Sequence, residues 1–205
     1  MRTAYLFTLL LFLAVAACAQ KNRPSKNNLE ALRPYDYQTK LSEGYKILFK
    51  ADDSLEYLYL TKRGKKIAQL SSDSRGMLYK SLGYVGADFK ECFVLVHSFG
   101  SGNPHEIELI KKSTGKNMLK SVAWWIDVDS QKKILLYSTE DVPTEKDKMI
   151  LYNVRTGQKR YFPFPTDCLD EPMILNNISI KTLTNKFLII AYNSKGHSKT
   201  KRYTL

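Results

Sequence analysis

The sequence predicts an all-β domain built from antiparallel hairpins, and three observations support this prediction. The chain contains 13 Tyr and 9 Phe, and aromatic residues are enriched in strands. No segment keeps the i, i+3, i+4, i+7 apolar pattern of an amphipathic helix. Short apolar or alternating runs follow one another instead, separated by short polar connections, which indicates that neighbouring strands are antiparallel.

About nine to twelve strands are expected, and nine segments carry a clear strand signal. The segments at 45–50, 55–60 and 105–111 alternate or nearly alternate, which is typical of strands with one buried face. Those at 93–98 and 187–192 are continuously apolar, as strands buried on both faces are. The remaining four predicted strands span 122–128, 133–138, 149–154 and 178–183.

A hairpin pattern repeats along the chain. Each copy reads as a strand, a tight turn that contains a glycine and a basic or amide residue, and a second strand. The copies span 57–70, 107–120 and 150–162, and their turn glycines are Gly64, Gly115 and Gly157. These glycines lie 51 and 42 residues apart, and glycine supplies the positive φ that such turns require. Residues 187–205 would be a fourth, degenerate copy.

This pattern, with a buried strand upstream of each hairpin, resembles the blades of a β-propeller, whose period is about 40–45 residues. The shared motif is a "TG" dipeptide followed by Lys or Gln, as in "TGK" at 114–116 and "TGQ" at 156–158. The resemblance implies a small propeller-like arrangement. A twisted meander or sandwich is the other architecture that these hairpins allow.

The first 19 residues read as an export signal. Arg2 precedes an apolar run of 14 residues from Ala4 to Ala17, which is too short to span a bilayer and fits a secretory h-region. The tetrapeptide "VAAC" ending at Cys18 resembles the lipobox of bacterial lipoproteins, which implies that Cys18 is lipidated and becomes the first residue. The small residues around Cys18 also suit ordinary signal peptidase, which would leave Gln20 first.

The predicted organisation is a signal peptide at 1–19, a flexible basic tether at 20–40 and a single all-β domain at 41–205. The lipobox implies an exported bacterial protein that is lipid-anchored to a membrane, in the outer membrane or periplasm. Once Cys18 is acylated or removed, Cys92 and Cys168 remain as an even pair. In an oxidising compartment this pair forms one disulfide or stays as two buried thiols.

The chain is strongly basic, with 32 Lys and Arg against 20 Asp and Glu and a formal net charge of +12. Basic residues gather at three predicted hairpin turns, whose candidate contact residues are Lys62, Lys65, Lys66, Lys116 and Lys199. If the hairpins lie in register, these turns share one rim that attracts an anionic partner such as lipid headgroups, envelope polysaccharide or an acidic protein. Ordinary solvated turns would also be rich in lysine. No nucleic-acid partner is expected for an exported chain.

Two adjacent tryptophans lie in the predicted strand at 122–128. Trp124 and Trp125 must face opposite sides of that strand, and Trp124 shares its face with Ile126 and Val128, which predicts a core position. Trp125 is therefore either an exposed contact for a protein or sugar or is covered by a second β-layer.

No segment carries a strong catalytic or metal-binding motif. Gly100 and Gly102 follow a strand, but the third glycine and the helix of a dinucleotide site are missing. The three histidines show no zinc-site spacing, so neither a metal nor a cofactor is predicted. The acidic pairs at 52–53, 140–141 and 170–171 lie in predicted loops, and a hydrolase would need two carboxylates converging in a cleft.

The sequence is therefore interpreted as that of a non-catalytic envelope lipoprotein, a scaffold or accessory subunit that binds a protein or an anionic envelope partner. Two alternatives stay open. A secreted inhibitor or immunity protein would cap an exported enzyme, with residues 99–106 as its binding loop. A hydrolase of envelope polymer would use a pair of the acids above.

Overall fold

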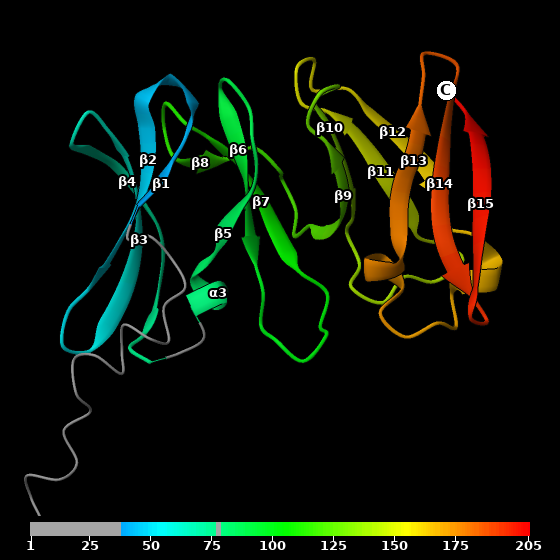
Figure 1. The fold of residues 1–205 in the computed structure, drawn as a ribbon, viewed down its shortest axis with the longest axis horizontal. Coiled ribbons are helices and arrows are strands. Elements are labelled where there is room, and N and C mark those ends of the chain that lie inside the picture. Colours follow the sequence, from blue (N-terminus) through cyan, green and yellow to red (C-terminus); the bar gives the residue numbers. More distant parts are fainter. Residues whose placement is uncertain (1–37, 77–78) are drawn as a thin grey trace, which may run out of the picture. The chain divides into compact units, whose positions relative to one another are not determined.

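The structure is a computed structural model that describes residues 38–76 and 79–205, where antiparallel strands dominate (Figure 1). The all-β prediction is confirmed, and all nine predicted strands are present. They form three antiparallel sheets of hairpins that are not closed into a barrel, consistent with a twisted sandwich or meander.

The first sheet contains four strands in sequence order. They are β1 (Gln38–Lys40), β2 (Tyr45–Ala51), β3 (Leu55–Lys62) and β4 (Lys65–Ser74). A short 3-10 helix, η1 (Ser42–Gly44), joins β1 to β2. Because Gln38–Lys40 pair with β2, the folded domain begins before residue 41 and includes three residues that the sequence assigned to the tether.

The second sheet contains eight strands in two hairpin groups. The first group, which follows the four-residue helix α3 (Tyr79–Leu82), comprises β5 (Tyr84–Asp88), β6 (Cys92–His97), β7 (Glu106–Lys111) and β8 (Lys116–Asn117). The second group comprises β9 (Trp124–Asp129), β10 (Ile134–Ser138), β11 (Lys148–Asn153) and β12 (Lys159–Pro163). The two groups meet through one residue pair between β7 and β9, Glu106 with Trp124.

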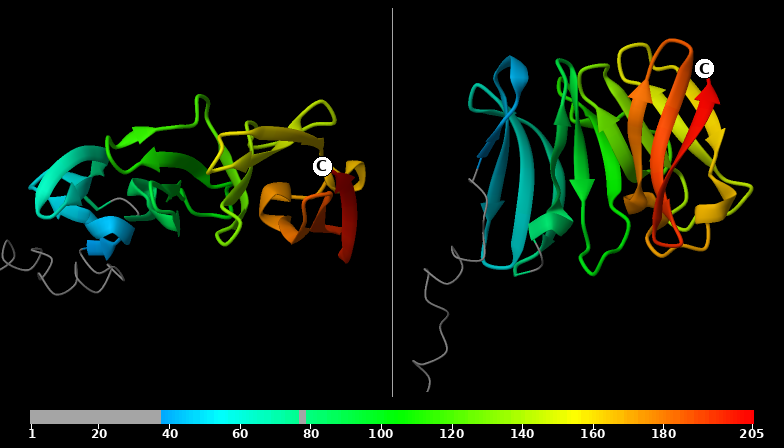
Figure 2. Two further views of the ribbon diagram at one scale, coloured as in Figure 1. Left: turned by 90° about the horizontal axis from the view of Figure 1, so that it is seen from above. Right: turned by 45° about the vertical axis from the view of Figure 1, so that its right-hand side comes forward.

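The third sheet contains β13 (Ile178–Leu183), β14 (Phe187–Ser194) and β15 (His197–Thr204). Two 3-10 helices, η2 (Thr166–Cys168) and η3 (Ile174–Asn177), precede it. We refer to β1–β4, β5–β8, β9–β12 and β13–β15 as the first to fourth units. Figures 1 and 2 show these units side by side in sequence order.

Three core layers lie between successive units. The first layer joins the first and second units through Leu41, Tyr45, Ile47, Leu58, Leu60, Phe93, Leu95 and Ile110. The second layer joins the second and third units through residues that include Val94, Val96, Ile107, Leu109, Leu135, Tyr137 and Ile150. The third layer joins the third and fourth units and includes Leu136, Met149, Leu151, Ile178, Leu188 and Ile190.

This stacking explains the continuously apolar strands. In β6, Phe93 and Leu95 face the first layer, while Val94 and Val96 face the second, and none of the four is more than 2 % exposed. Alternate side chains of one strand therefore fill different cores. Each such burial stabilises the fold by about 1.5–3 kcal/mol.

The predicted glycine hairpins are present in the first three units. Gly64, Gly115 and Gly157 have φ of 80°, 70° and 74°, and each lies between the third and fourth strands of its unit. At Gly115 a second constraint applies, because a Cβ atom there would lie 2.2 Å from the Cβ of Ala68 in β4. The turn of the second unit thus packs directly on the first unit.

A β-bulge in β9 makes one prediction wrong, namely that Val128 lies on the same face of the strand as Trp124. The register with β10 shifts so that Asp127 pairs with Leu136 while Trp125 pairs with Tyr137. As a result, Trp125 and Val128 both pack against the second core layer, while Trp124 and Ile126 belong to the third. The sequence placed Val128 with Trp124, because strict alternation does not anticipate the extra residue of a bulge.

The two cysteines are free and buried, so the disulfide that the sequence left open is not formed. Cys92 lies in β6 and packs in the second core layer, whereas Cys168 lies in η2 and packs in the third. Burial raises the pKa of both thiols to about 11. The alternative that the sequence allowed, two separately buried thiols, describes the structure.

Candidate functional site: the basic edge

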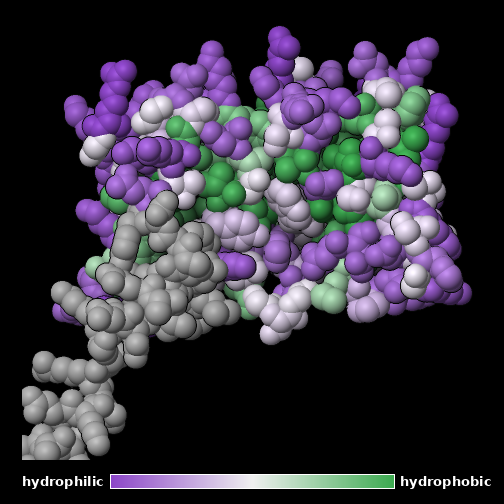
Figure 3. Space-filling model, in the orientation of Figure 1, coloured by the Kyte–Doolittle hydropathy of each residue, from purple (hydrophilic) through white to green (hydrophobic). Residues whose placement is uncertain are grey.

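Successive connections fall at opposite edges of the sheets, because strand direction alternates within each unit (Figure 1). The upper edge of that view carries the connections after β1, β3, β5, β7, β9, β11 and β13. The lower edge carries those after β2, β4, β6, β8, β10, β12 and β14. Hydrophilic side chains gather along both edges, with an apolar band between them (Figure 3).

The two edges carry opposite charge. The upper connections hold seven basic residues and two acids, namely Arg63, Lys90, Lys112, Lys132, Lys133, Arg155 and Lys186 against Glu43 and Glu91. In the described part of the chain, the lower connections hold nine acids and five basic residues, namely Asp52, Asp53, Glu140, Asp141, Glu145, Asp147, Asp167, Asp170 and Glu171 against Arg75, Lys80, Lys120, Lys146 and Lys195. Charge is therefore sorted by edge.

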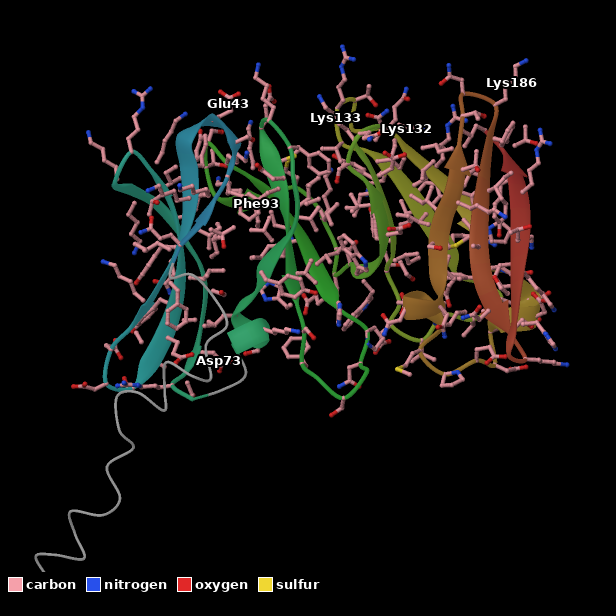
Figure 4. The ribbon with its side chains drawn as sticks, viewed as in Figure 1. Glu43, Asp73, Phe93, Lys132, Lys133 and Lys186 are labelled. Atoms are coloured by element: carbon pink, nitrogen blue, oxygen red, sulfur yellow. The ribbon has the colours of Figure 1, made fainter. Side chains whose placement is uncertain are left out.

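Lysines at the strand ends extend the upper group. We define the basic edge as the seven basic residues of the upper connections together with Lys62, Lys65, Lys66, Lys111 and Lys116. Figure 4 shows Lys132, Lys133 and Lys186 at this edge, with Asp73 toward the opposite one. Except for Lys112, which is buried, and Lys62, which is half-buried, these side chains are exposed. Exposed like charges spaced along one edge create a positive field that extends into solvent.

The basic edge of the first two units surrounds a depression of about 240 Å³. Its lining includes Lys62, Lys90 and Lys111 together with Glu43 and Glu91. The Lys62 ammonium lies 4.1 Å from the ring centroid of Tyr45, a cation–π contact that holds the charge near the edge. Two acids partly offset the positive charge here.

A buried lysine fixes this part of the edge. Lys112 is 1 % exposed, and its Nζ lies 2.6 Å from Asp88 Oδ1. The same ammonium donates hydrogen bonds to the Phe89 carbonyl oxygen at 2.6 Å and to Ser42 Oγ at 2.7 Å. Since Ser42 belongs to the first unit and Lys112, Asp88 and Phe89 to the second, these bonds hold the upper ends of the two units together.

The basic edge of the third and fourth units is held by Lys132. Its Nζ donates a hydrogen bond to the Leu183 carbonyl oxygen and lies 3.6 Å from Asp129 Oδ2. The bond joins the turn between β9 and β10 to the end of β13. A pocket of about 500 Å³ opens beside Lys132, between these units.

Acids at the lower edge are engaged in turns. Asp52 accepts hydrogen bonds from the backbone nitrogens of Leu55 and Ser54 and from the Tyr57 hydroxyl. These bonds, the one from Leu55 first, lower the pKa of Asp52 to about 2. A general acid for glycoside hydrolysis requires a raised pKa instead. Asp52, one of the acids that the sequence singled out, is therefore an ionised side chain that stabilises its own turn by accepting these hydrogen bonds.

Four of the five predicted lysines lie on the basic edge, namely Lys62, Lys65, Lys66 and Lys116. Lys199 does not, and its predicted place on the same rim is wrong. Its turn joins β14 to β15, the second and third strands of the fourth unit, and this connection falls at the lower edge. There Lys199 Nζ lies 2.6 Å from Asp167 Oδ2, and that ammonium lowers the pKa of the Asp167 carboxyl.

Sequence reasoning missed several basic-edge residues. Lys90, Lys132, Lys133 and Lys186 lie in connections that were not singled out, and Arg155 lies in the predicted turn at Gly157, which was not counted among the basic turns. The usable signal was the parity of the connections, because every second connection along an antiparallel meander returns to the same edge. The basic edge can be recognised in the sequence only if every second connection is considered together, because single lysines in separate connections then fall into one group.

Trp125 lies away from the basic edge. It is half-buried against the second core layer, and its ring is so close to Gly86 that a Cβ there would lie 3.2 Å from it. Its backbone nitrogen donates to the His105 carbonyl oxygen. A second β-layer therefore covers Trp125, which was the second of the two expectations.

The glycine-rich loop at 98–105 joins β6 to β7 at the lower edge. A Cβ on Gly102 would lie 2.4 Å from the sulfur of Met173, and the Asn176 side chain donates to the Gly102 carbonyl oxygen at 3.4 Å. The loop thus packs against the segment around η3. In the described ranges no group of three His, Cys, Asp or Glu side chains has a metal-binding arrangement.

Cys18, the signal peptide and residues 20–37 of the tether lie outside the described residues. Within residues 38–76 and 79–205, no helix is long and apolar enough to cross a membrane. No protein-family model matches this chain, and no curated protein matches it.

Proposed function

We propose that this chain is a non-catalytic, lipid-anchored protein of the bacterial envelope that binds a polyanionic partner through its basic edge. The single observation that carries the proposal is the sorting of charge, with basic connections at one edge and acidic connections at the other. A random scatter of solvated lysines would not separate in this way. Membrane attachment through Cys18 is a separate part of the proposal and depends on the lipobox.

The form of the basic edge favours an extended partner. Its exposed charges come from all four units, so a polymer or a charged surface can contact several of them at once. Most of them are lysines, whose ammonium groups act as mobile point charges rather than rigid bidentate donors. Binding of this kind depends on salt, because exposed charges are screened over about 10 Å at 0.1 M ionic strength.

The experiment compares two variants with the same change in net charge. Lys65→Glu with Lys90→Glu alters the basic edge, and Lys146→Glu with Lys148→Glu is the matched control near the lower edge. All four side chains are exposed. Binding to polygalacturonate and to phosphatidylglycerol vesicles is measured between 50 and 300 mM salt (about the range over which surface charges become screened).

The basic-edge variant should bind at least about 30-fold more weakly at low salt, since each surface lysine contributes about 1 kcal/mol toward an anionic surface. The control should stay within about threefold of the parent. Equal losses in both variants would mean that net charge alone governs binding, and the proposal would be wrong. The intact mass of the membrane-extracted protein tests the anchor separately, because acylation at Cys18 adds the mass of the acyl chains.

A second candidate is an inhibitor that docks through the lower edge. Phe99 and Met173 are each 49 % exposed, and both belong to lower-edge connections whose segments touch at Gly102. Exposed aromatic and methionine side chains are typical anchors at protein interfaces. Loss of a co-purifying protein in Phe99→Ser, with polyanion binding unchanged, would favour this candidate.

A further inference from the structure

We propose that the pocket at the basic edge between the third and fourth units binds a small hydroxylated organic anion, the carboxylate- or phosphate-bearing end group of the polyanionic partner. This inference rests on the proposed function and deepens it. The basic edge would attract the partner over its length, and the pocket would recognise its terminal unit.

The pocket has the size and the floor of a small-molecule site. Its volume is about 500 Å³, within the range of about 300–1,000 Å³ for ligand pockets. Ile134, Leu151 and Leu183 line it and are only 5–7 % exposed, so they form an aliphatic floor. A floor of this kind packs against the C–H face of a sugar or glycerol unit.

The polar lining consists of donors and of groups that both donate and accept. It comprises Lys132, Asn153, Gln158, Arg160, Thr184 and Asn185. Neither Asp nor Glu is among the described residues that line the pocket, which also include Leu205, the last residue described. The Lys132 ammonium lies 3.6 Å from Asp129 Oδ2, so Arg160 is the cation of this lining with no opposing carboxylate among the described residues. Its guanidinium favours an anionic ligand, and the amide and hydroxyl side chains favour a ligand that carries hydroxyl groups.

Three of these side chains have hydrogen-bonding groups to spare. The side chains of Arg160 and Asn185 form no hydrogen bond or ion pair with the described residues. Asn153 Oδ1 accepts the backbone nitrogens of Arg155 and Thr156 at 3.0 Å, which leaves its amide nitrogen as a donor. A free guanidinium is suited to a bidentate bond with carboxylate or phosphate.

Lys132 lines two adjacent pockets that differ in the charge of their other residues. Its contacts with the Leu183 carbonyl and Asp129 hold it on the wall between this pocket and a neighbouring one of about 470 Å³. The neighbouring pocket is lined by Asp127 and Asp129, whose carboxylates repel an anion. Of the two adjacent pockets, only the one beside Arg160 combines two cations with a lining in which the described residues include no Asp or Glu.

The test is calorimetric titration of the full chain with galacturonate, glycerol 1-phosphate and neutral galactose, each to about 10 mM. One or both anions should bind with one-to-one stoichiometry, and galactose should bind at least about tenfold more weakly. The two anions distinguish a polysaccharide end group from a phosphoglycerol unit.

Two variants locate the site. Arg160→Gln should weaken anion binding at least about tenfold, which corresponds to the loss of one charge-assisted bond, while Asn185→Asp should abolish it by placing a carboxylate in the pocket. Both positions are exposed, and the unfolding midpoint of each variant verifies folding. The Lys65→Glu, Lys90→Glu variant carries its substitutions in the first and second units, away from the pocket, and should retain small-anion binding.

The outcomes separate this inference from the proposed function. Absence of binding by either anion, equal binding of galactose, or full binding by Arg160→Gln would overturn the pocket assignment even if polygalacturonate still binds the basic edge. Conversely, small-anion binding that is lost in Arg160→Gln supports the pocket even if the polymer experiment fails.

Discussion

Removing the counter-charge of the buried lysine should destabilise the fold more than removing the lysine itself. Lys112 is 1 % exposed, whereas its partner Asp88 is 28 % exposed. Asp88→Asn keeps the shape and an acceptor oxygen but leaves the ammonium buried without an opposite charge. Breaking a buried ion pair in this way costs about 3–5 kcal/mol. Because Asp88 is partly solvated, we expect about 2–3 kcal/mol.

Lys112→Met should cost less, about 1–2 kcal/mol. The substitution removes the buried charge and keeps an unbranched stem, but Ser42 Oγ loses this donor, and the Phe89 carbonyl oxygen is left, among the described residues, with only its hydrogen bond from Ser42 Oγ. A lost partner for a buried acceptor costs about 1–3 kcal/mol. The apolar replacement offsets part of that loss, because burying an ion is itself unfavourable.

Urea unfolding followed by tryptophan fluorescence measures both variants, with Asp53→Asn, an exposed lower-edge acid, as the control. A loss of 2–3 kcal/mol should lower the melting temperature by roughly 5–10 °C in a domain of this size. An Asp88→Asn stability within about 0.5 kcal/mol of the control, or a larger loss for Lys112→Met than for Asp88→Asn, would refute the reasoning.

Three further predictions concern the turns, a histidine and the thiols. Gly115→Ala should cost about 2–4 kcal/mol through positive φ and overpacking, whereas Gly64→Ala, with open space around it, should cost about 1–2 kcal/mol; equal urea midpoints would contradict this. Burial disfavours charged His97, but hydrogen bonding to Glu108 and the Ser81 carbonyl raises its pKa overall. Its contribution to stability should therefore be complete below pH 6.5 and decline as pH rises through the raised pKa; His97→Gln should flatten that dependence in urea titrations. The two buried thiols should resist Ellman's reagent at about pH 8, below their pKa of about 11, and react fully on unfolding; if no thiol appears in denaturant, they are joined after all.

Local sequence signals predicted the strands and the turns well. Strand periodicity depends on neighbouring residues alone, so the runs at 93–98 and 187–192 correctly indicated strands β6 and β14. Positive φ at Gly64 and Gly115 follows from the steric freedom of glycine within a two-strand turn. Neither prediction needed knowledge of what packs on these elements.

Faces and register were predicted less well. The bulge in β9 places Val128 on the opposite face from Trp124, and no residue in that strand indicates from its type that a bulge occurs there. The two cysteines also could not be assigned from sequence. Whether Cys92 and Cys168 pair depends on which core layer each enters, and that is a property of sheet stacking.

The sequence by itself determined an all-β chain with a high positive charge, glycine hairpins and an apolar leader, since each of these is a local or compositional property. Only the tertiary structure decided which cations lie at the same edge. Strand parity sends Lys90 and Lys186 to one edge and Lys199 to the other, although all three lie in or beside short turns. The stacking of the third and fourth units then brings Lys132 and Arg160, which are far apart from Asn185 in the chain, around one pocket. The distance between two side chains on different sheets depends on the packing of every core layer between them. A local sequence pattern carries no information about that packing.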